Sequence, residues 1–254
     1  MNKLLNRVPE VTLFFWIIKI MATTVGETAA DFLAFTLNFG LSATSYVMGG
    51  LLLAALWMQL RMKRYVPANY WIVVVLLSVV GTLITDRLVD QAGISLVTTT
   101  IAFSIALVLT FVLWYRSEKT LSIHSVFTDR RELFYWAAIL FTFALGTAAG
   151  DLFAEGMKLG YGPSALIFGA VIAAITLAHY VFKLNAVLAF WLAYILTRPL
   201  GASMGDLLSH PVANGGLGLG TTTTSIVFLV IILGLVTFIT LQHKKQLVLA
   251  GVKQ

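Results

Sequence analysis

One pattern occurs four times in the sequence: a tryptophan, nine residues, a glycine, four residues and an aspartate. The four copies are Trp16, Gly26 and Asp31; Trp71, Gly81 and Asp86; Trp136, Gly146 and Asp151; and Trp191, Gly201 and Asp206. The aspartates are 55, 65 and 55 residues apart, which indicates a unit that was duplicated and then duplicated again. The chain is therefore expected to fold as four similar units.

Composition places these units in a membrane. Of the 254 residues, 59% are hydrophobic and 11% are charged, against about 25% charged in an ordinary soluble domain. Apolar runs of about 20 residues are long enough to cross a bilayer as helices. The predicted spans are Leu13–Phe35, Ser42–Leu60, Tyr70–Asp86, Ser95–Trp114, Leu133–Phe153, Ser164–Phe182, Asn185–Leu208 and Thr221–Leu241. The predicted two-helix repeats cover approximately residues 11–62, 66–116, 131–183 and 186–242, within a single transmembrane domain of residues 1–254.

The predicted fold is an all-α integral membrane protein with eight transmembrane helices. Because each unit crosses the membrane twice, the copies insert in the same orientation, related by a pseudo-symmetry axis along the membrane normal. Most of the 17 Lys and Arg residues lie in the tails and in the loops after the second, fourth and sixth spans. The positive-inside rule therefore predicts cytoplasmic N- and C-termini. This bias also accounts for the net charge of +6, so nucleic acid is not an expected partner.

The first repeat carries the string FWIIKIMATTVGETAAD from Phe15 to Asp31. This string, and the four tandem two-helix repeats that each hold a tryptophan, resemble a bacterial four-repeat membrane protein family whose members are labelled uncharacterised membrane-anchored proteins. The resemblance extends over nearly the whole chain. It implies this architecture and a place in the bacterial cytoplasmic (inner) membrane, and it implies no activity.

The candidate site is a set of acidic and hydroxyl side chains in the odd-numbered spans. Each repeat aspartate lies about 22 Å along the helix from its tryptophan, in the outer half of the bilayer. An ionisable side chain at that depth is costly, and it usually faces a cavity or a partner charge. The predicted ion-binding residues are Asp31, Glu27, Asp86, Asp151, Asp206, Thr23 and Thr24. Glu27 and Asp31 share one helix face and are the predicted metal ligands, because hard cations prefer oxygen atoms.

Several of these residues have alternative interpretations. Lys19 and Arg198, the basic residues within spans, are predicted as a proton relay or charge partners, although Lys19 is equally consistent with a side chain that reaches back to the inner surface. Pro199, after Arg198, indicates either a broken helix or a simple kink. Each aspartate has the alternative of capping the next helix or pairing with one basic residue. The histidines show no common spacing, so no zinc site built on them is predicted: His124, His179, His210 and His243.

These residues favour a small cation transporter without a cofactor, in which intramembrane carboxylates bind a divalent metal and exchange it for protons. The alternatives are a cation channel with a ring of four aspartates, and a membrane sensor or partner subunit without transport activity. An enzyme is not expected, because no nucleophile with a His/Asp pattern, H-E-x-x-H motif or nucleotide motif occurs. The expected partners are the lipid bilayer and a small cation or metal ion; a homo-oligomer remains an open alternative.

Overall fold

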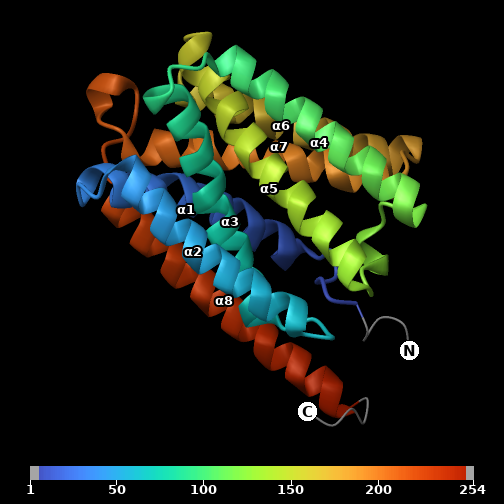
Figure 1. Cartoon of the computed structure of the whole chain (residues 1–254). Coiled ribbons are helices and arrows are strands. Elements are labelled where there is room, and N and C mark those ends of the chain that lie inside the picture. Colours follow the sequence, from blue (N-terminus) through green and yellow to red (C-terminus); the bar gives the residue numbers. More distant parts are fainter. Residues whose placement is uncertain (1–5, 250–254) are drawn as a thin grey trace.

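The computed structural model describes residues 6–249, and within this range it contains helices and no strands (Figure 1). The long helices are α1 (Leu13–Asp31), α2 (Gly40–Arg61), α3 (Pro67–Asp86), α4 (Leu96–Glu118), α5 (Asp129–Asp151), α6 (Tyr161–Phe182), α7 (Ala186–Ser209) and α8 (Thr221–Leu249). Two 3₁₀ turns, η4 (Ile123–Ser125) and η6 (Val212–Asn214), lie in the loops. All eight long helices have the length and hydropathy of membrane spans. The prediction of an all-α fold with eight helices that are long and apolar enough to cross a membrane is confirmed.

Polar side chains mark where several helices begin. They accept hydrogen bonds from backbone N–H groups of the first turn, which have no partner inside the helix. These capping residues are Thr12, Ser95, Thr128 and Asn185. Helix α8 continues to Leu249, past the predicted end at Leu241, because the predicted boundary followed the end of the apolar run, and polar residues continue the helix beyond it.

The odd-numbered helices form a closed ring. Helix α1 packs on α3 and α7, and α5 packs on the same two helices (Figure 1). The repeat glycines lie at these crossings, where a methyl group would overlap the next helix. Gly26 meets Ser78, Gly81 meets Phe143, Gly146 meets Arg198, and Gly201 meets Thr23. The four glycines thus make equivalent contacts around the ring, as the predicted pseudo-symmetry requires.

The even-numbered helices cover the outside of the ring. Each packs on the first helix of the next repeat, α2 on α3, α4 on α5 and α6 on α7, and α8 completes the circle on α1. The most apolar windows of the odd spans are 56–61% buried, whereas those of the even spans are 6–22% buried. The even helices therefore present apolar side chains outward, as expected of a multi-pass membrane protein.

Candidate functional site

The four repeat aspartates lie at the same end of the ring. Asp31, Asp86 and Asp151 are the last residues of α1, α3 and α5, and the chain continues from each as a π-helical turn. The turns are η2 (Phe32–Thr36), η3 (Arg87–Gln91) and η5 (Leu152–Gly156). None of the three aspartate side chains makes a capping hydrogen bond there, so the capping alternative is wrong for these copies. Such π-helical turns are rare in proteins, and those that do occur often lie at functional sites.

Two groups of side chains hold their ligand atoms close enough to share a cation. In the first, the Glu27 triad, ligand atoms of Glu27, Asp151 and Asp206 all lie within 4.8 Å of one another. In the second, the His210 triad, the same holds for Asp31, Asp206 and His210. Asp206 belongs to both triads. Carboxylates from α1, α5 and α7 thus converge on one place. We call these residues and Asp86 the acidic cluster: Glu27, Asp31, Asp86, Asp151 and Asp206.

Positive charge is scarce in the acidic cluster. Across residues 6–249, the carboxylates of Asp31, Asp86 and Asp151 form no ion pair and accept no hydrogen bond. Asp86 lies within electrostatic range of Glu27, Asp31 and Asp151. Its neighbour Arg87 instead places its guanidinium 5.3 Å from the ring centre of Tyr46. The alternative of one basic partner for each aspartate is therefore wrong for these three.

The acidic cluster extends from the interior of the ring to its surface. Glu27 and Asp206 are buried, with 5% and 6% of their surface exposed. Asp31, Asp86 and Asp151 are half-buried, and further acids, Asp90 and Glu155, are exposed at the same end. A cation arriving at this end of the ring meets carboxylates along its whole way in, which concentrates cations there.

Arg198 lies beneath the acidic cluster and is fully buried. Its guanidinium donates to Glu27 Oε2 at 3.0 Å, to Thr147 Oγ1 at 2.8 Å, to Thr82 Oγ1 and to the carbonyl oxygen of Thr23 at 3.1 Å. It thereby connects α7 with α1, α3 and α5. Arg198, one of the two predicted charge partners, forms an ion pair with Glu27.

Helix α7 is continuous through Pro199, so of the two alternatives for this position the broken helix is wrong. Neighbouring side chains bond to the backbone carbonyls before the proline. Lys19 Nζ donates to the carbonyl oxygen of Tyr194 at 3.2 Å, and Thr23 Oγ1 donates to that of Thr197 at 3.2 Å. These bonds from α1 support the polar backbone next to the proline without a break in the helix.

Lys19 does not reach toward the membrane surface, and that alternative is wrong. The residue is fully buried inside the ring. Its Nζ donates to Thr197 Oγ1 at 2.6 Å and lies 3.7 Å from the ring centre of Tyr194 and 5.0 Å from that of Phe143. Lys19 is thus held by hydroxyl, carbonyl and aromatic groups, at a distance along α1 from the acidic cluster.

The hydroxyls of Thr23 and Thr24 both donate to backbone carbonyl oxygens, that of Thr23 within α1 and to α7 and that of Thr24 within α1. Thr23 Oγ1 donates to the carbonyl oxygens of Ile20, at 2.7 Å, and of Thr197. Thr24 Oγ1 donates to the carbonyl oxygen of Ile20 at 3.1 Å. Both residues are buried beside the acidic cluster, but these bonds aim their hydroxyl hydrogens at backbone carbonyls rather than at its carboxylates.

His210 is the residue that the sequence pattern missed. Its Nδ1 lies 3.2 Å from the carbonyl oxygen of Asp206 and 3.7 Å from Asp206 Oδ1. The imidazole stacks on the ring of Tyr161, with ring centres 4.9 Å apart, and the Tyr161 hydroxyl donates to Glu155 at 3.0 Å. A spacing of four residues from Asp206 at a helix end was the available signal. Spacing among the histidines themselves carried none.

Four repeats of the chain match the family described as Repeat of Unknown Function (DUF347), at residues 14–65, 69–120, 134–185 and 189–245. The chain belongs to this family. The expected membership of a four-repeat family without an established activity is thereby confirmed. A search of curated proteins and a search of solved structures both found no match.

The copies of the DUF347 repeat share their aspartate and differ just before it. Four residues earlier stand Glu27, Thr82, Thr147 and Ala202. Eight residues earlier stand Thr23, Ser78, Phe143 and Arg198. The common frame therefore supplies the aspartates, while the unequal positions supply one further negative charge on α1 and one positive charge on α7.

Proposed function

We propose that the protein carries a small cation, with a divalent metal ion as the best-fitting substrate, across a membrane in exchange for protons. The observation that carries this proposal is the convergence of carboxylates from all four repeats on one cluster with a single buried arginine. An uncompensated buried charge is costly. Carboxylates placed in this way are expected to meet positive charge from outside the protein.

The donor atoms favour a divalent ion. The Glu27 triad offers carboxylate oxygen only, which suits Mg²⁺, Ca²⁺ and Mn²⁺. The His210 triad adds one imidazole to two carboxylates, a set that also suits first-row transition metals. Mn²⁺ is the ion that both donor sets accept, and we take it as the first substrate to test.

Proton exchange follows from the crowding of the carboxylates. Carboxylates that share one site repel each other when all are ionised, so protons or a metal ion must neutralise part of their charge. A metal ion that binds there displaces protons, because its ligands are deprotonated. Release of the metal on the other side then takes up protons, which couples the two movements.

The interior of the ring favours a transporter over a permanently open channel. Below the acidic cluster follow the buried side chains of Arg198 and Lys19 and, nearer the beginnings of the odd helices, the hydrogen-bonded hydroxyls of Tyr70 and Tyr135, 2.5 Å apart. These groups fill the ring. A cation crosses only if they move, which is the property of a carrier that opens to one side at a time.

The charge bias of the loops supports a place in the bacterial cytoplasmic membrane, with both termini cytoplasmic. In this orientation the acidic cluster faces outward and the beginnings of the odd helices face the cytoplasm. The structure then corresponds to a state that accepts cations from the outer side.

Uptake of Mn²⁺ into proteoliposomes, with a pH gradient as the driving force, tests the proposal. Asp206→Asn removes a carboxylate from both triads and is expected to lower uptake by a factor of about ten or more, as loss of a metal ligand does. Asp90→Asn is the matched control, because Asp90 is an exposed acid at the same end that belongs to neither triad. It only adds to the negative charge at the entrance, so its loss is expected to change uptake by about twofold or less.

Both variants are first compared with the unchanged protein by size-exclusion chromatography, so that a folding defect is recognised. Uptake that depends on the pH gradient and is lost in Asp206→Asn alone supports the proposal. Equal uptake by Asp206→Asn and the unchanged protein contradicts it, and so does conductance through an open pore in single-channel recordings.

A further inference from the structure

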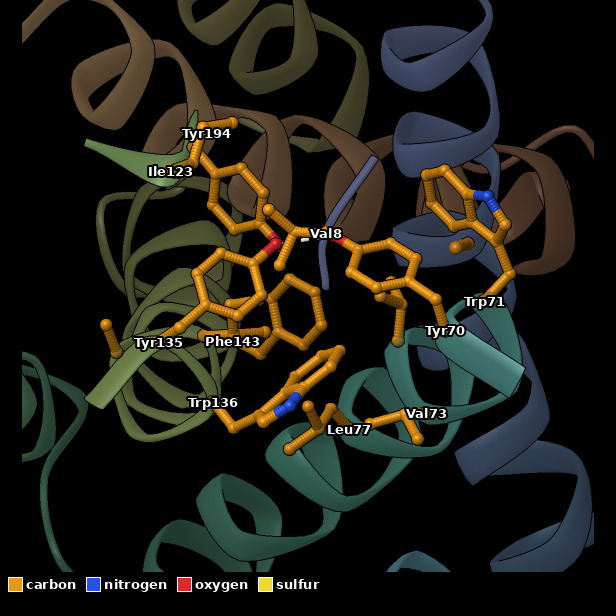
Figure 2. Close-up of a cluster of buried hydrophobic side chains, with 14 of the residues drawn as sticks. Val8, Tyr70, Trp71, Val73, Leu77, Ile123, Tyr135, Trp136, Phe143 and Tyr194 are labelled. Atoms are coloured by element: carbon orange, nitrogen blue, oxygen red, sulfur yellow. Dashed lines mark hydrogen bonds between the residues drawn. The ribbon is translucent and has the colours of Figure 1, made fainter. Parts of the chain in front are cut away.

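The end of the ring opposite the acidic cluster is closed by the chain that precedes α1. Asn6, Arg7, Val8 and Pro9 are all buried there, although they belong to no helix. Val8 is 2% exposed and belongs to the same buried cluster as Tyr70 and Tyr135. Figure 2 draws its side chain in this cluster with those of Tyr70 on α3 and Tyr135 on α5. We call residues 6–9 the N-terminal plug.

Hydrogen bonds hold the plug between the loops that lead into α3 and α5. The backbone N–H of Arg7 donates to the carbonyl oxygen of Val126 at 3.1 Å, and that of Tyr65 donates to the carbonyl oxygen of Asn6 at 3.1 Å. The side-chain amide of Asn6 donates to the carbonyl oxygen of Ile123 at 3.1 Å and accepts from the N–H of Val126 at 3.2 Å. The plug is thus seated by specific pairing as well as by apolar contact.

One buried ion pair secures the plug. Arg7 Nη1 lies 2.7 Å from Glu132 Oε2 and 2.5 Å from Asp129 Oδ1. Glu132 is fully buried and also accepts from Gln59 Nε2 at 2.8 Å. Burial alone lowers the pKa of Arg7, but hydrogen bonds to the two carboxylates outweigh it and raise that pKa above its ordinary value. Glu132 therefore depends on the charge of the plug for its neutralisation.

We infer that the N-terminal plug is the gate at the end of the ring opposite the acidic cluster, and that it withdraws when the ion pairs of Arg7 with Glu132 and Asp129 are broken. This inference rests on the proposed transport function. The plug packs on the buried cluster that contains Tyr70 and Tyr135, and it is not part of any ring helix. It can therefore leave while the four ring helices keep their contacts.

The space next to the plug gives it somewhere to go. A groove of about 440 Å³ lies between the plug, the beginning of α1 and the end of α8, lined among others by Val8, Thr12, Tyr65 and His243. Movement of Val8 into this groove would uncover the hydroxyls of Tyr70 and Tyr135. The ring would then be open to the loops of this end.

The first test reports opening without any transport measurement. The chain has no cysteine, so Val8→Cys creates a single reporter for a water-soluble maleimide. Glu132→Gln removes the buried one of the two carboxylates that hold Arg7. It is expected to raise the labelling rate by about tenfold or more, since the loss of one partner from a buried ion pair shifts such an equilibrium by at least that factor. Glu118→Gln, which breaks the more exposed pair with Arg131, is the control and leaves the rate within about twofold.

The second test locks the plug during transport. Asn6→Cys with Val126→Cys joins the plug to the loop before α5 by a disulfide, and Asn6→Cys alone, treated with the same oxidant, is the control. Oxidation is expected to abolish Mn²⁺ uptake in the double variant and to spare it in the single variant, with recovery under reductant. Full uptake by the oxidised double variant overturns the gate and leaves the transporter standing.

The two tests separate the gate from the transport proposal. Absence of uptake in the reduced protein contradicts transport, and the labelling of Val8→Cys still decides whether the plug opens. Equal labelling of Val8→Cys with and without Glu132→Gln overturns the gate, whatever the uptake.

Discussion

The two ends of the helix ring are made from the same four helices, but they differ in whether their buried carboxylates have hydrogen-bond and ion-pair partners. At the end where the helices begin, Glu132 has an arginine, an amide and a tryptophan N–H as partners. At the acidic end, three of the four repeat aspartates have no polar partner within the described part of the chain. At the first end the charges are neutralised within the chain, whereas the acidic end retains binding capacity for a positive charge from outside the chain.

The largest effect is expected when the buried ion pair between Arg7 and Glu132 is broken. Arg7→Met leaves the fully buried Glu132 without its counter-charge and is expected to lower the free energy of unfolding by about 3–5 kcal/mol. Arg131→Met, which removes a more exposed ion pair with Glu118, is the control and is expected to cost about 1 kcal/mol or less. Thermal unfolding in detergent, followed by tryptophan fluorescence, measures both. Equal losses would erase the difference between buried and exposed pairs on which the comparison depends.

A somewhat smaller change in the free energy of unfolding is expected when Mn²⁺ binds at the acidic end. Mn²⁺ at a hundred times its dissociation constant would stabilise the protein by about 2.7 kcal/mol, because it binds the folded state. The same unfolding measurement with and without Mn²⁺ checks this. Asp206→Asn is expected to lose most of the gain and Asp90→Asn to keep it. An equal gain in all three proteins would mean that the ion acts elsewhere.

His210 sharpens the comparison by showing which metals the acidic end prefers. His210→Ala removes the only imidazole of the two triads and is expected to weaken Co²⁺ or Zn²⁺ binding by about tenfold, with a smaller effect on Ca²⁺, which favours oxygen ligands. Isothermal titration calorimetry with each ion measures the ratio of its dissociation constants for the variant and the unchanged protein. His124→Ala is the control, since His124 lies in the loop at the opposite end. An equal loss for all ions would assign His210 a purely structural role.

The smallest expected effect concerns stability without metal. Asp151→Asn removes one charge from a crowded group that lacks a partner, so it is expected to be neutral or to stabilise the metal-free protein by about 1 kcal/mol. Glu27→Gln, which removes the partner of Arg198, is the contrasting variant and is expected to destabilise. Destabilisation by Asp151→Asn as great as that by Arg7→Met would show that the aspartate is structurally paired after all.

The repeat made much of this architecture predictable. The apolar runs predict eight helices. Equal spacing of Trp, Gly and Asp in four of them gives the aspartates an equivalent depth and so places them at one end. The partner of Glu27 was not predictable in the same way. Arg198 stands in the position of Thr23, and only its long side chain brings its charge to the level of Glu27.

Residues without a periodic neighbour were missed for a related reason. His210 follows the end of α7, where no repeat pattern continues. The plug is a short polar and apolar stretch that has no helical or strand periodicity, so only the coordinates reveal its burial. The sequence is consistent with two interpretations of Lys19, because a lysine in a span commonly reaches the surface. In the structure the aromatic rings of Phe143 and Tyr194 hold it inside.

A structure determined in the presence of Mn²⁺, with anomalous scattering to locate the metal, tests most directly whether the acidic end exists to hold a cation. The expected result is a manganese peak between the carboxylates of Glu27, Asp151 and Asp206, absent in Asp206→Asn. A protein saturated with Mn²⁺ whose acidic cluster shows no peak, or whose peak survives in Asp206→Asn, would contradict this account.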